Sequence, residues 1–598
     1  MLNAFASVPG PLAWWKVEGT PHLELVTRVR EMRNMQGDRK FLDLRNATLY
    51  ADRSISGFGV IGTRRHSTVP SLSLNVIRNM VQTAVSKIAA KNRPKPKFLT
   101  DGGDYESRVL AENLDKFVSG IFRETKAYVE TDRAFAHACI FGTGFVKVYE
   151  ADGRVCIEHA PTYTIVVDEA EGLHMKPRNM YQRLYIDRHT LAESYPDKES
   201  EIMTVAASAD DREFSWQSNA DQVLVTEAWH LAGPKSPGRH VIAIDNATLV
   251  DEEWEDPFPF AVIRWQEDVI GYFGVGIAEA QAGKQREINK LLQQIQKGHH
   301  LIQGHWMVQN GQTLVQQINN DLAAIVKYSG TPPTYHAPSV ISQEIYAHLW
   351  QIYNKAFEDE GVSQMNATGQ KPAGLDSEPA QRTYQDIASE RFMKVGRDYE
   401  QFIIDIAHLV VRMAKKIGGS YSVRSVAQGA VEQIRWSDVA VDDPVIDVYP
   451  VSMIPSTPAG KLAWAQDMIQ AGMIPPEDVL DIVDFPDTQQ YVRRANASRR
   501  IIERNIKTML TDGLAVSPEP FDDHHLALRL VNQAYHDARL DMVPDTRLGL
   551  LRDYMALTQG FIAQATPPPG PALGPMPGAG PMPGPGPGSA PMPMPEAA

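Results

Sequence analysis

Two glycine-rich motifs in this sequence have residue types that could hold a phosphate group. Residues 57–62, GFGVIG, have the glycine spacing of a dinucleotide-binding loop. Such a loop works only between a buried strand and a helix N-terminus that meets the pyrophosphate. The flanking segments ADRSIS and TRRHSTVP form neither pattern. A flexible loop is therefore favoured, and a nucleotide site is the alternative.

The second motif, Gly276 followed by Gly283-Lys284, resembles a phosphate-binding loop only superficially. A Walker A loop needs Gly-x4-Gly-Lys-Ser/Thr, whereas the spacing here is longer and Gln285 replaces the hydroxyl side chain. No ATPase motor is predicted from it. The sequence also has no paired Cys-x-x-Cys, serine-elbow, zinc-protease or kinase signature. We therefore expect a protein that is not an enzyme and needs no cofactor.

Histidine and carboxylate side chains gather at two places that could bind a metal. Residues 522–525, DDHH, offer four ligand types in a row, but adjacent residues on a helix point in different directions. Carboxylates that cap a helix start are the favoured interpretation, with a metal site as the alternative. Residues 299–300, HH, fit a helix-dipole or interface role better than a metal site.

Length and charge limit the classes of function. The chain has 598 residues, with 59 Lys and Arg against 73 Asp and Glu, a net charge of −14. This length favours several cooperating regions over one core. The acidic balance argues against tight nucleic-acid binding over the whole surface, because such binding needs cations that displace counterions from phosphate. Any DNA contact is expected to be local or weak.

The two cysteines and the terminal sequence indicate the compartment. Cys139 and Cys156 cannot supply a dense disulfide framework, fit a reducing environment and are expected to be buried small hydrophobes. The N-terminal stretch lacks the charge and apolar pattern of a signal peptide. Residues 402–413, the most apolar helical stretch, are too short and too charged to span a bilayer. We expect no membrane segment.

The first part of the chain mixes helix and strand patterns. Helical apolar spacing occurs at 75–90, 110–122 and 128–140. Residues 91–97, KNRPKPK, predict an extended connector because two prolines exclude a helix. Asp152-Gly153 predicts a tight hairpin. Strand-like runs occur at 145–150, 154–159, 164–168, 223–231, 240–250 and 260–265.

From Gly276 the apolar period changes from two to about 3.6 residues. A helix of about 33 Å is predicted from there to about Lys297. A second helix is predicted at about 340–360, after an insert with three prolines. Two helices joined by a distal insert predict a stalk.

A loop and a long helix are expected next. Residues 365–379 must form a loop because Gly369, Pro372 and Gly374 break helices. A helix is predicted over 377–417, where apolar residues alternate spacings of three and four and so form a packing seam. The seam comprises Phe392, Val395, Tyr399, Phe402, Ile406, Leu409 and Met413.

In the last part of the chain, first the predicted secondary structure and then the composition changes. Short strands around 420–426 and 445–451 predict a return to the sheet region, and helical patterns continue to about Ala565. From Pro567 onward the sequence is rich in Pro, Gly and Met with a single charge, Glu596. Such a segment favours polyproline II or disorder because it lacks the apolar bulk for a core.

The order of these parts resembles the portal proteins of tailed bacteriophages, and four local motifs carry the resemblance. Residues 75–81, NVIRNMV, before the basic Pro-containing linker resemble the family's early helix. Residues 135–148, FAHACIFGTGFVKV, resemble its wing, and residues 272–276, YFGVG, with Gln285 and Asn289 downstream, resemble the entry to a stem helix. Gly361-Val-Ser and the later Glu390-Arg391-Phe392 resemble the tunnel-loop region.

The resemblance implies a multidomain α+β subunit with wing, stem, clip and crown, long helices and a disordered tail. The implied parts are an N-terminal arm and outer wing (1–74), an α+β wing (75–270), a first stem helix (271–300), a clip (301–338), a second stem helix (339–361), a tunnel loop (362–378), a long helix and wing return (379–456), a helical crown (457–565) and a disordered Pro/Gly/Met-rich tail (566–598).

The resemblance also implies a function. Portal subunits form a homo-oligomeric ring, here expected to be dodecameric, at one vertex of the virion, assembled in the host cytoplasm. Double-stranded DNA passes through the ring during packaging and ejection. The implied partners are the major capsid protein, the terminase and neck or adaptor proteins, without a membrane. A capsid or baseplate scaffold without a DNA channel, and a packaging enzyme, are the alternatives.

Specific residues are expected to face the DNA. They are Gly369, Gln370, Lys371, Pro372 and Gly374 in the tunnel loop, and Lys284, Lys290 and Lys297 in the stem. Lys371 would make transient phosphate contacts in an otherwise acidic channel that limits sticking. A solvated loop lysine is an equal alternative for Lys371.

Overall fold

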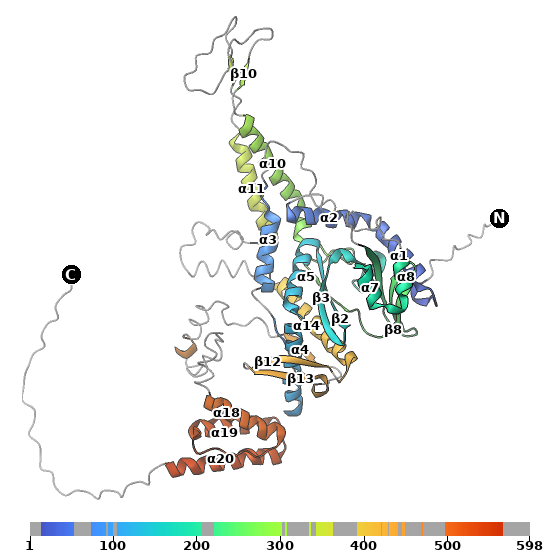
Figure 1. Ribbon diagram of the computed structural model, residues 1–598. Coiled ribbons are helices and arrows are strands. Elements are labelled where there is room, and N and C mark those ends of the chain that lie inside the picture. Colours follow the sequence, from blue (N-terminus) through green and yellow to red (C-terminus); the bar gives the residue numbers. More distant parts are fainter. Residues whose placement is uncertain are drawn as a thin grey trace, which may run out of the picture. The chain divides into compact units, whose positions relative to one another are not determined.

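The protein is a mixed α+β chain with antiparallel sheets, as expected from the sequence. The computed structural model describes residues 13–52, 73–90, 94–99, 105–205, 221–301, 305–307, 334–336, 342–362, 392–419, 421–427, 430–439, 445–448, 466, 468–470 and 497–565 (Figure 1). The chain divides into two compact units, Met1–Val479 and Leu480–Ala598. The expected wing, stem, clip and crown boundaries stay predictions.

A five-stranded antiparallel sheet has the order β4-β5-β6-β7-β8. Its strands are β4 (Ile165–Val166), β5 (Asn179–Asp187), β6 (Gln222–His230), β7 (Gly238–Ile244) and β8 (Ala247–Trp254). The single strand predicted over 240–250 was wrong, because a turn at Asp245-Asn246, two turn-forming residues, divides it into β7 and β8. Strand β5 was not predicted.

Two N-terminal helices precede the helices that the sequence predicted. They are α1 (Pro21–Met35) and α2 (Gly37–Ala51). Trp14, Leu25 and Val29 form a buried cluster with Tyr181 and Val241 of the sheet. Helix α1 therefore covers part of one sheet face, and the Trp14 indole donates to the Tyr181 hydroxyl at 3.0 Å.

The central core joins three helices to a second, three-stranded sheet. Helix α3 (Val76–Val85) continues as the wider turn η2 (Ser86–Ala90), and α4 (Tyr105–Glu124) and α5 (Ala127–Phe141) follow, as predicted. Strand β2 (Thr143–Ala151) pairs with β3 (Arg154–Ala160) and β9 (Phe260–Arg264). Asp152 and Gly153 have φ values of 53° and 71°, which confirms the predicted tight hairpin.

A helical hairpin follows this sheet (Figure 1). A short helix α9 (Ile277–Ala280) precedes α10 (Ala282–Leu301), and α11 (Gln343–Glu360) packs against α10. The prediction of one unbroken helix was wrong at Gln281, whose φ of −97° and ψ of 2° interrupt it. Between α10 and α11, β10 (His305–Met307) pairs with β11 (Thr334–His336).

Helix α14 (Met393–Ile417) carries the predicted packing seam. Phe392, Tyr399, Phe402 and Ile406 are buried, as are Val410 and Ala414. The predicted Leu409 and Met413, like Val395, are only partly buried. The buried stripe drifts because a straight helix has 3.6 residues per turn and departs from a 3.5-residue repeat. Residues 363–391, including the first part of the predicted long helix, lie outside the described residues.

The partners of α14 lie within its own chain. The helix contacts β2, β9 and β14, and its buried residues belong to the central core cluster with Phe117, Phe135 and Ile263. Its apolar seam is therefore not surplus surface that must be covered by another copy.

The expected return to the sheet region forms two separate small sheets. Strands β12 (Ser422–Ala427) and β13 (Ala430–Arg435) pair as a hairpin. Strand β14 (Val445–Val448) pairs with β1 (Pro96–Leu99), at the end of the predicted basic connector. Pro96 is the first residue of β1, which agrees with the exclusion of proline from central strand positions.

The described part of the second unit is helical, as predicted. It contains α18 (Ala497–Lys507), the wider turn η7 (Thr508–Asp512), α19 (His524–Leu540) and α20 (Asp545–Ala565). Met509, Val531, Leu551 and Tyr554 are buried. The tail 566–598 lies outside the described residues. Of the helices that are described anywhere in the chain, none combines the length and apolar character needed to cross a membrane.

Candidate functional site

The base of the α10–α11 hairpin is the candidate functional site, because the stem-entry motif lies there. Gln285 is buried, and its side chain forms hydrogen bonds with backbone groups at the start of α3, more than 200 residues earlier in the sequence. Its Oε1 accepts from the Val76 amide at 2.8 Å, and its Nε2 donates to the Leu74 carbonyl at 2.7 Å. A helix N-terminus has unpaired amides that need such partners. Gln285 therefore fixes α10 to α3.

The wing and stem-entry motifs meet at a second point. The Gly274 amide donates to Thr143 Oγ1 at 2.8 Å in a buried position. A Cβ atom at Gly142, where φ is +90°, would lie 1.8 Å from the Gly274 carbonyl oxygen, and one at Gly276 would lie 2.7 Å from the Ile140 oxygen. Only glycine permits this approach of two backbones. The glycines in these two motifs thus serve packing, not phosphate binding.

The expected stem lysines have different surroundings. Lys284 Nζ forms an ion pair with Asp359 of α11 and also donates to Gln281 Oε1 at 3.2 Å. Lys290 is exposed and lies 3.4 Å from Glu287, one turn earlier. Lys297 lies in α10, but its side chain is outside the described part of the structure. Lys284 thus links the two helices of the hairpin at their base.

The half-buried carboxyl group of Glu360 also contributes to this link. Gln281 Nε2 donates to Glu360 Oε1 at 2.8 Å. Burial raises the pKa of the Glu360 carboxyl, although the hydrogen bond from Gln281 acts in the opposite direction. The interruption at Gln281 therefore has a structural use, because it directs this amide towards α11.

The expected tunnel-loop residues Gly369, Gln370, Lys371, Pro372 and Gly374 all lie outside the described residues. The structure therefore neither brings them together with Lys284 and Lys290 nor separates them. Their role stays a prediction.

A buried cluster between the two larger sheets has residue types that could do acid–base chemistry. Lys147 Nζ lies 2.5 Å from Glu227 Oε2, and His240 Nε2 lies 3.1 Å from Glu227 Oε1. Burial alone would raise the pKa of the Glu227 carboxyl, but the charge of Lys147 and the bond with His240 lower it. Each group has a partner within the cluster, which fits a structural ion pair that joins β2 to β6 and β7.

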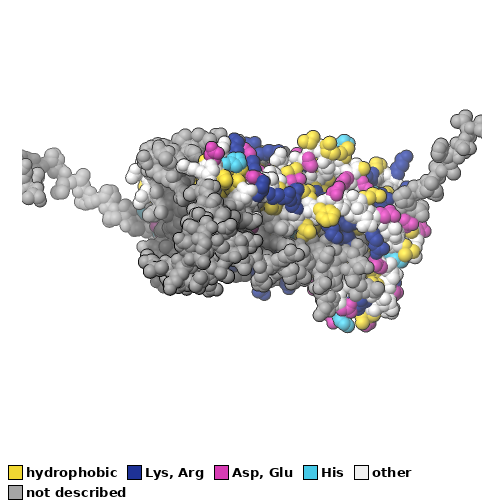
Figure 2. Space-filling model, turned by 90° about the horizontal axis from the view of Figure 1, so that it is seen from above, with side chains coloured by type: hydrophobic (Ala, Val, Ile, Leu, Met, Phe, Trp, Pro, Cys, Tyr) yellow, Lys and Arg dark blue, Asp and Glu magenta, His cyan; other side chains and the backbone are white. Residues whose placement is uncertain are grey.

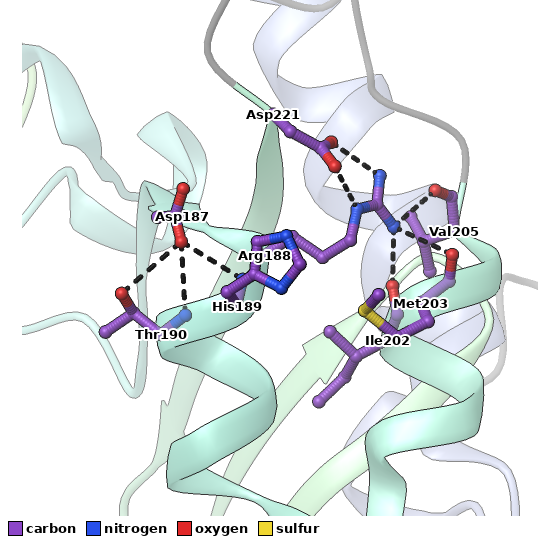
Figure 3. A network of polar contacts seen from close by, with 8 residues as sticks. All are labelled: Asp187, Arg188, His189, Thr190, Ile202, Met203, Val205 and Asp221. Atoms are coloured by element: carbon purple, nitrogen blue, oxygen red, sulfur yellow. Dashed lines mark hydrogen bonds and ion pairs between the residues drawn. The ribbon is translucent and has the colours of Figure 1, made fainter.

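Arg188 forms a second dense polar network, shown in Figure 3. Its guanidinium makes two bonds to Asp221, at 2.8 and 2.9 Å, and donates to the carbonyls of Ile202 and Val205 at 2.6 and 2.8 Å. These carbonyls lie in and just after α8 (Glu199–Thr204), where a cation is favoured by the helix dipole. Arg188 is thus occupied in holding α8.

The sequence analysis missed both clusters. Their members are far apart in the chain, and each residue alone is an ordinary charge on a strand or helix. One local signal was present: Lys147 lies in the apolar run FVKV, where an unpaired lysine would be costly to bury.

The metal and cysteine predictions have clear outcomes. Asp523 Oδ1 accepts from the Leu526 amide at 3.1 Å at the start of α19, so the capping interpretation is confirmed. The described residues contain no group of three or more His, Cys, Asp or Glu side chains that could hold a metal ion. Cys139 is buried as predicted, whereas Cys156 is half-buried, and both are free thiols. His299 and His300 lie in α10, with side chains outside the described structure.

Comparison with protein families finds a match over part of the chain. Residues 59–235 match the model of the Phage P22-like portal protein family. This part of the chain is therefore similar to a P22-like portal protein domain, which confirms the portal resemblance there. The matched residues include Thr143 and Lys147 but end before the α10–α11 hairpin. Among curated proteins, none matches the chain significantly.

Proposed function

We propose that this chain is the subunit of a portal ring at one capsid vertex and that the ring conducts double-stranded DNA during packaging and ejection. The match of residues 59–235 to the P22-like portal family carries the proposal. The hydrogen bond between Thr143, inside the matched domain, and Gly274, at the entry to the hairpin, supports its extension to α10 and α11. In this proposal α10 and α11 are the stem, and residues 301–338 are the clip.

The finer parts of the proposal concern partners and subunit number. A dodecamer would contact the major capsid protein through the wing, and the terminase and later the neck or adaptor proteins through the clip. The charges of the described surface suit a passive conduit, because Lys and Arg are interspersed with Asp and Glu on the face shown in Figure 2. A net charge of −14 limits sticking of DNA along a channel.

Electron microscopy of the purified full chain tests the ring. We expect closed rings with a central hole and, by native mass measurement, twelve copies. Rings without a hole would favour the capsid or baseplate scaffold, and monomers at assembly concentrations would contradict the proposal.

The tunnel loop is tested separately, in particles assembled with mutant rings. Lys371→Glu should preserve rings but lower the DNA content per particle, with a salt-dependent defect as expected for phosphate contacts. Lys371→Arg keeps the charge and should package normally. Full particles from Lys371→Glu would remove this lysine from the mechanism.

A further inference from the structure

Three aromatic rings gather at one end of the helices of the second unit. The ring of His524, the first residue of α19, stacks on that of Phe561, near the end of α20, with centroids 4.9 Å apart and planes 8° apart. The start of α19 therefore lies beside the end of α20, and the two helices pack along each other (Figure 1). Phe521, three residues before α19, is 97% exposed.

A tight turn holds Phe521 next to the stacked pair. The Asp522 amide donates to the Glu519 carbonyl at 3.1 Å, and the Glu519 amide donates to Asp522 Oδ2 at 2.9 Å. The Pro520 carbonyl lies 3.4 Å from His524 Nε2. One exposed aromatic residue is common on a protein surface. A ring that is fixed beside a stacked pair instead forms part of an aromatic surface, here made by Phe521, His524 and Phe561.

The proline-rich tail begins at this same end of the helices. Helix α20 ends at Ala565, four residues and a rise of about 6 Å after Phe561. Residues 567–571, PPPGP, follow almost directly. Pro568 and Pro571 have the Pro-x-x-Pro spacing of segments that dock on aromatic surfaces as polyproline II. At about 3.1 Å per residue, these five residues extend about 15 Å, which is enough to return over Phe561.

The charges around the aromatic surface favour an uncharged occupant. Glu519, Asp522 and Asp523 lie in the turn and directly after it. Like charges that face each other across an interface are unfavourable, so a phosphate backbone or an acidic peptide is disfavoured there. The tail has no charged residue from 566 to 595. Its first segment therefore has both the residue type and the charge that this surface requires.

We propose that the aromatic surface of Phe521, His524 and Phe561 binds the proline-rich segment 567–571 of the same chain. Proline rings pack on aromatic faces, and the segment loses little conformational entropy because proline already restricts its backbone. The contact fastens the start of the tail to the second unit. The inference does not depend on the proposed function, because it concerns one subunit.

Photo-crosslinking in the full-length protein tests this contact. Phe521→p-benzoylphenylalanine keeps an aromatic side chain at the surface, and on irradiation it should form a link to residues 566–598 within a single chain. Leu540→p-benzoylphenylalanine is the matched control, because Leu540 is 80% exposed at the opposite end of α19. The control should give roughly tenfold less of the linked product. Mass spectrometry identifies the linked residues and the mass of the product.

Two further variants in the Phe521→p-benzoylphenylalanine chain test which prolines bind, and neither changes a residue of the helical fold. The first variant removes the prolines of the proposed segment and should lower the yield roughly tenfold; it is Pro567→Ala/Pro568→Ala/Pro569→Ala/Pro571→Ala. The second variant removes the same number of prolines further along the tail and should keep the yield; it is Pro583→Ala/Pro585→Ala/Pro587→Ala/Pro591→Ala.

Three results would overturn the proposal. The first is the absence of a link from position 521 to the tail, or equal yields from positions 521 and 540. The second is a linked product of twice the chain mass, which would show that another copy supplies the occupant. The third is an equal yield from the two proline variants, which would show that segment 567–571 is not the part that binds.

Discussion

The Gly274 amide donates a hydrogen bond of 2.8 Å to Thr143 Oγ1, although 131 positions separate the two residues in the chain. The bond joins the start of β2, within the matched portal domain, to the loop that leads into α9 and α10. Because both groups are buried, losing either partner would leave an unsatisfied polar atom. The contact therefore couples the geometry of the hairpin to that of the matched domain.

Gly274→Ala should destabilise the unit Met1–Val479. A Cβ atom there would lie 2.4 Å from the Gln266 carbonyl oxygen, so the backbone must shift and the bond to Thr143 must weaken. We expect a cost of about 2–3 kcal/mol, measured as a lower midpoint of urea unfolding. Gly283→Ala is the matched control, since its Cβ would meet nothing within 4 Å inside α10, and it should be neutral or stabilising by up to about 1 kcal/mol. Equal effects of both changes would contradict the close-approach argument.

Lys147→Met should cost about 3–5 kcal/mol, because it leaves the Glu227 carboxylate buried without its charge partner. Replacing both residues, Lys147→Met with Glu227→Leu, should recover most of this loss. Thermal unfolding of the two variants checks the prediction. If the double variant is no more stable than the single one, the two side chains are not coupled as described.

Acid should weaken the protein through two partly buried histidines, His137 and His159. The rings of His137 and His159 lie 4.2 Å apart, and burial lowers the pKa of His137 to about 3 and that of His159 to about 4. For His159, the nearby Glu130 raises the pKa and Arg133 lowers it. Both folded pKa values lie below the unfolded value of about 6.5, so the unfolded chain takes up protons first as the pH falls.

The stability contributed by these neutral rings is therefore fully present above about pH 6.5 and decreases below it, by up to about 1.4 kcal/mol per pH unit for each histidine. The free energy of unfolding, obtained from urea unfolding between about pH 7 and 4, should show this slope. His159→Gln should flatten it, whereas His189→Gln, on an exposed residue, should not. An identical slope in the wild type and His159→Gln would refute the assignment.

Phe402→Asp should prevent folding of the subunit itself. Phe402 is 1% exposed and lies in the core cluster of its own chain, and an unpaired carboxylate in that position costs several kcal/mol. The expected result is insoluble or protease-sensitive protein. Met393→Asp, at a residue 55% exposed on the same helix, should remain soluble. Folded, soluble Phe402→Asp monomers would show that the seam is buried between subunits instead.

Local features of the fold could be predicted from the sequence. The Asp152-Gly153 turn, helix α11 and the capping role of Asp523 depend on neighbouring residues. Hydrophobic periodicity placed α3, α4 and α5 for the same reason. In α14 the buried positions shift from the predicted Leu409 and Met413 to Val410 and Ala414. The reason is that a straight helix does not keep the 3.5-residue repeat on which the prediction of the seam depended.

The sequence by itself thus determined many of the helices and strands after residue 75, the acidic balance and the motifs of the portal resemblance, because each depends on short-range pattern or on composition. Tertiary structure alone decided what those motifs do. Gln285 caps α3, Lys147 neutralises Glu227, and the glycines around Thr143 and Gly274 allow two backbones to meet. In each case the partner lies at least 80 residues away, and the energy of a buried polar group depends on whether that distant partner reaches it.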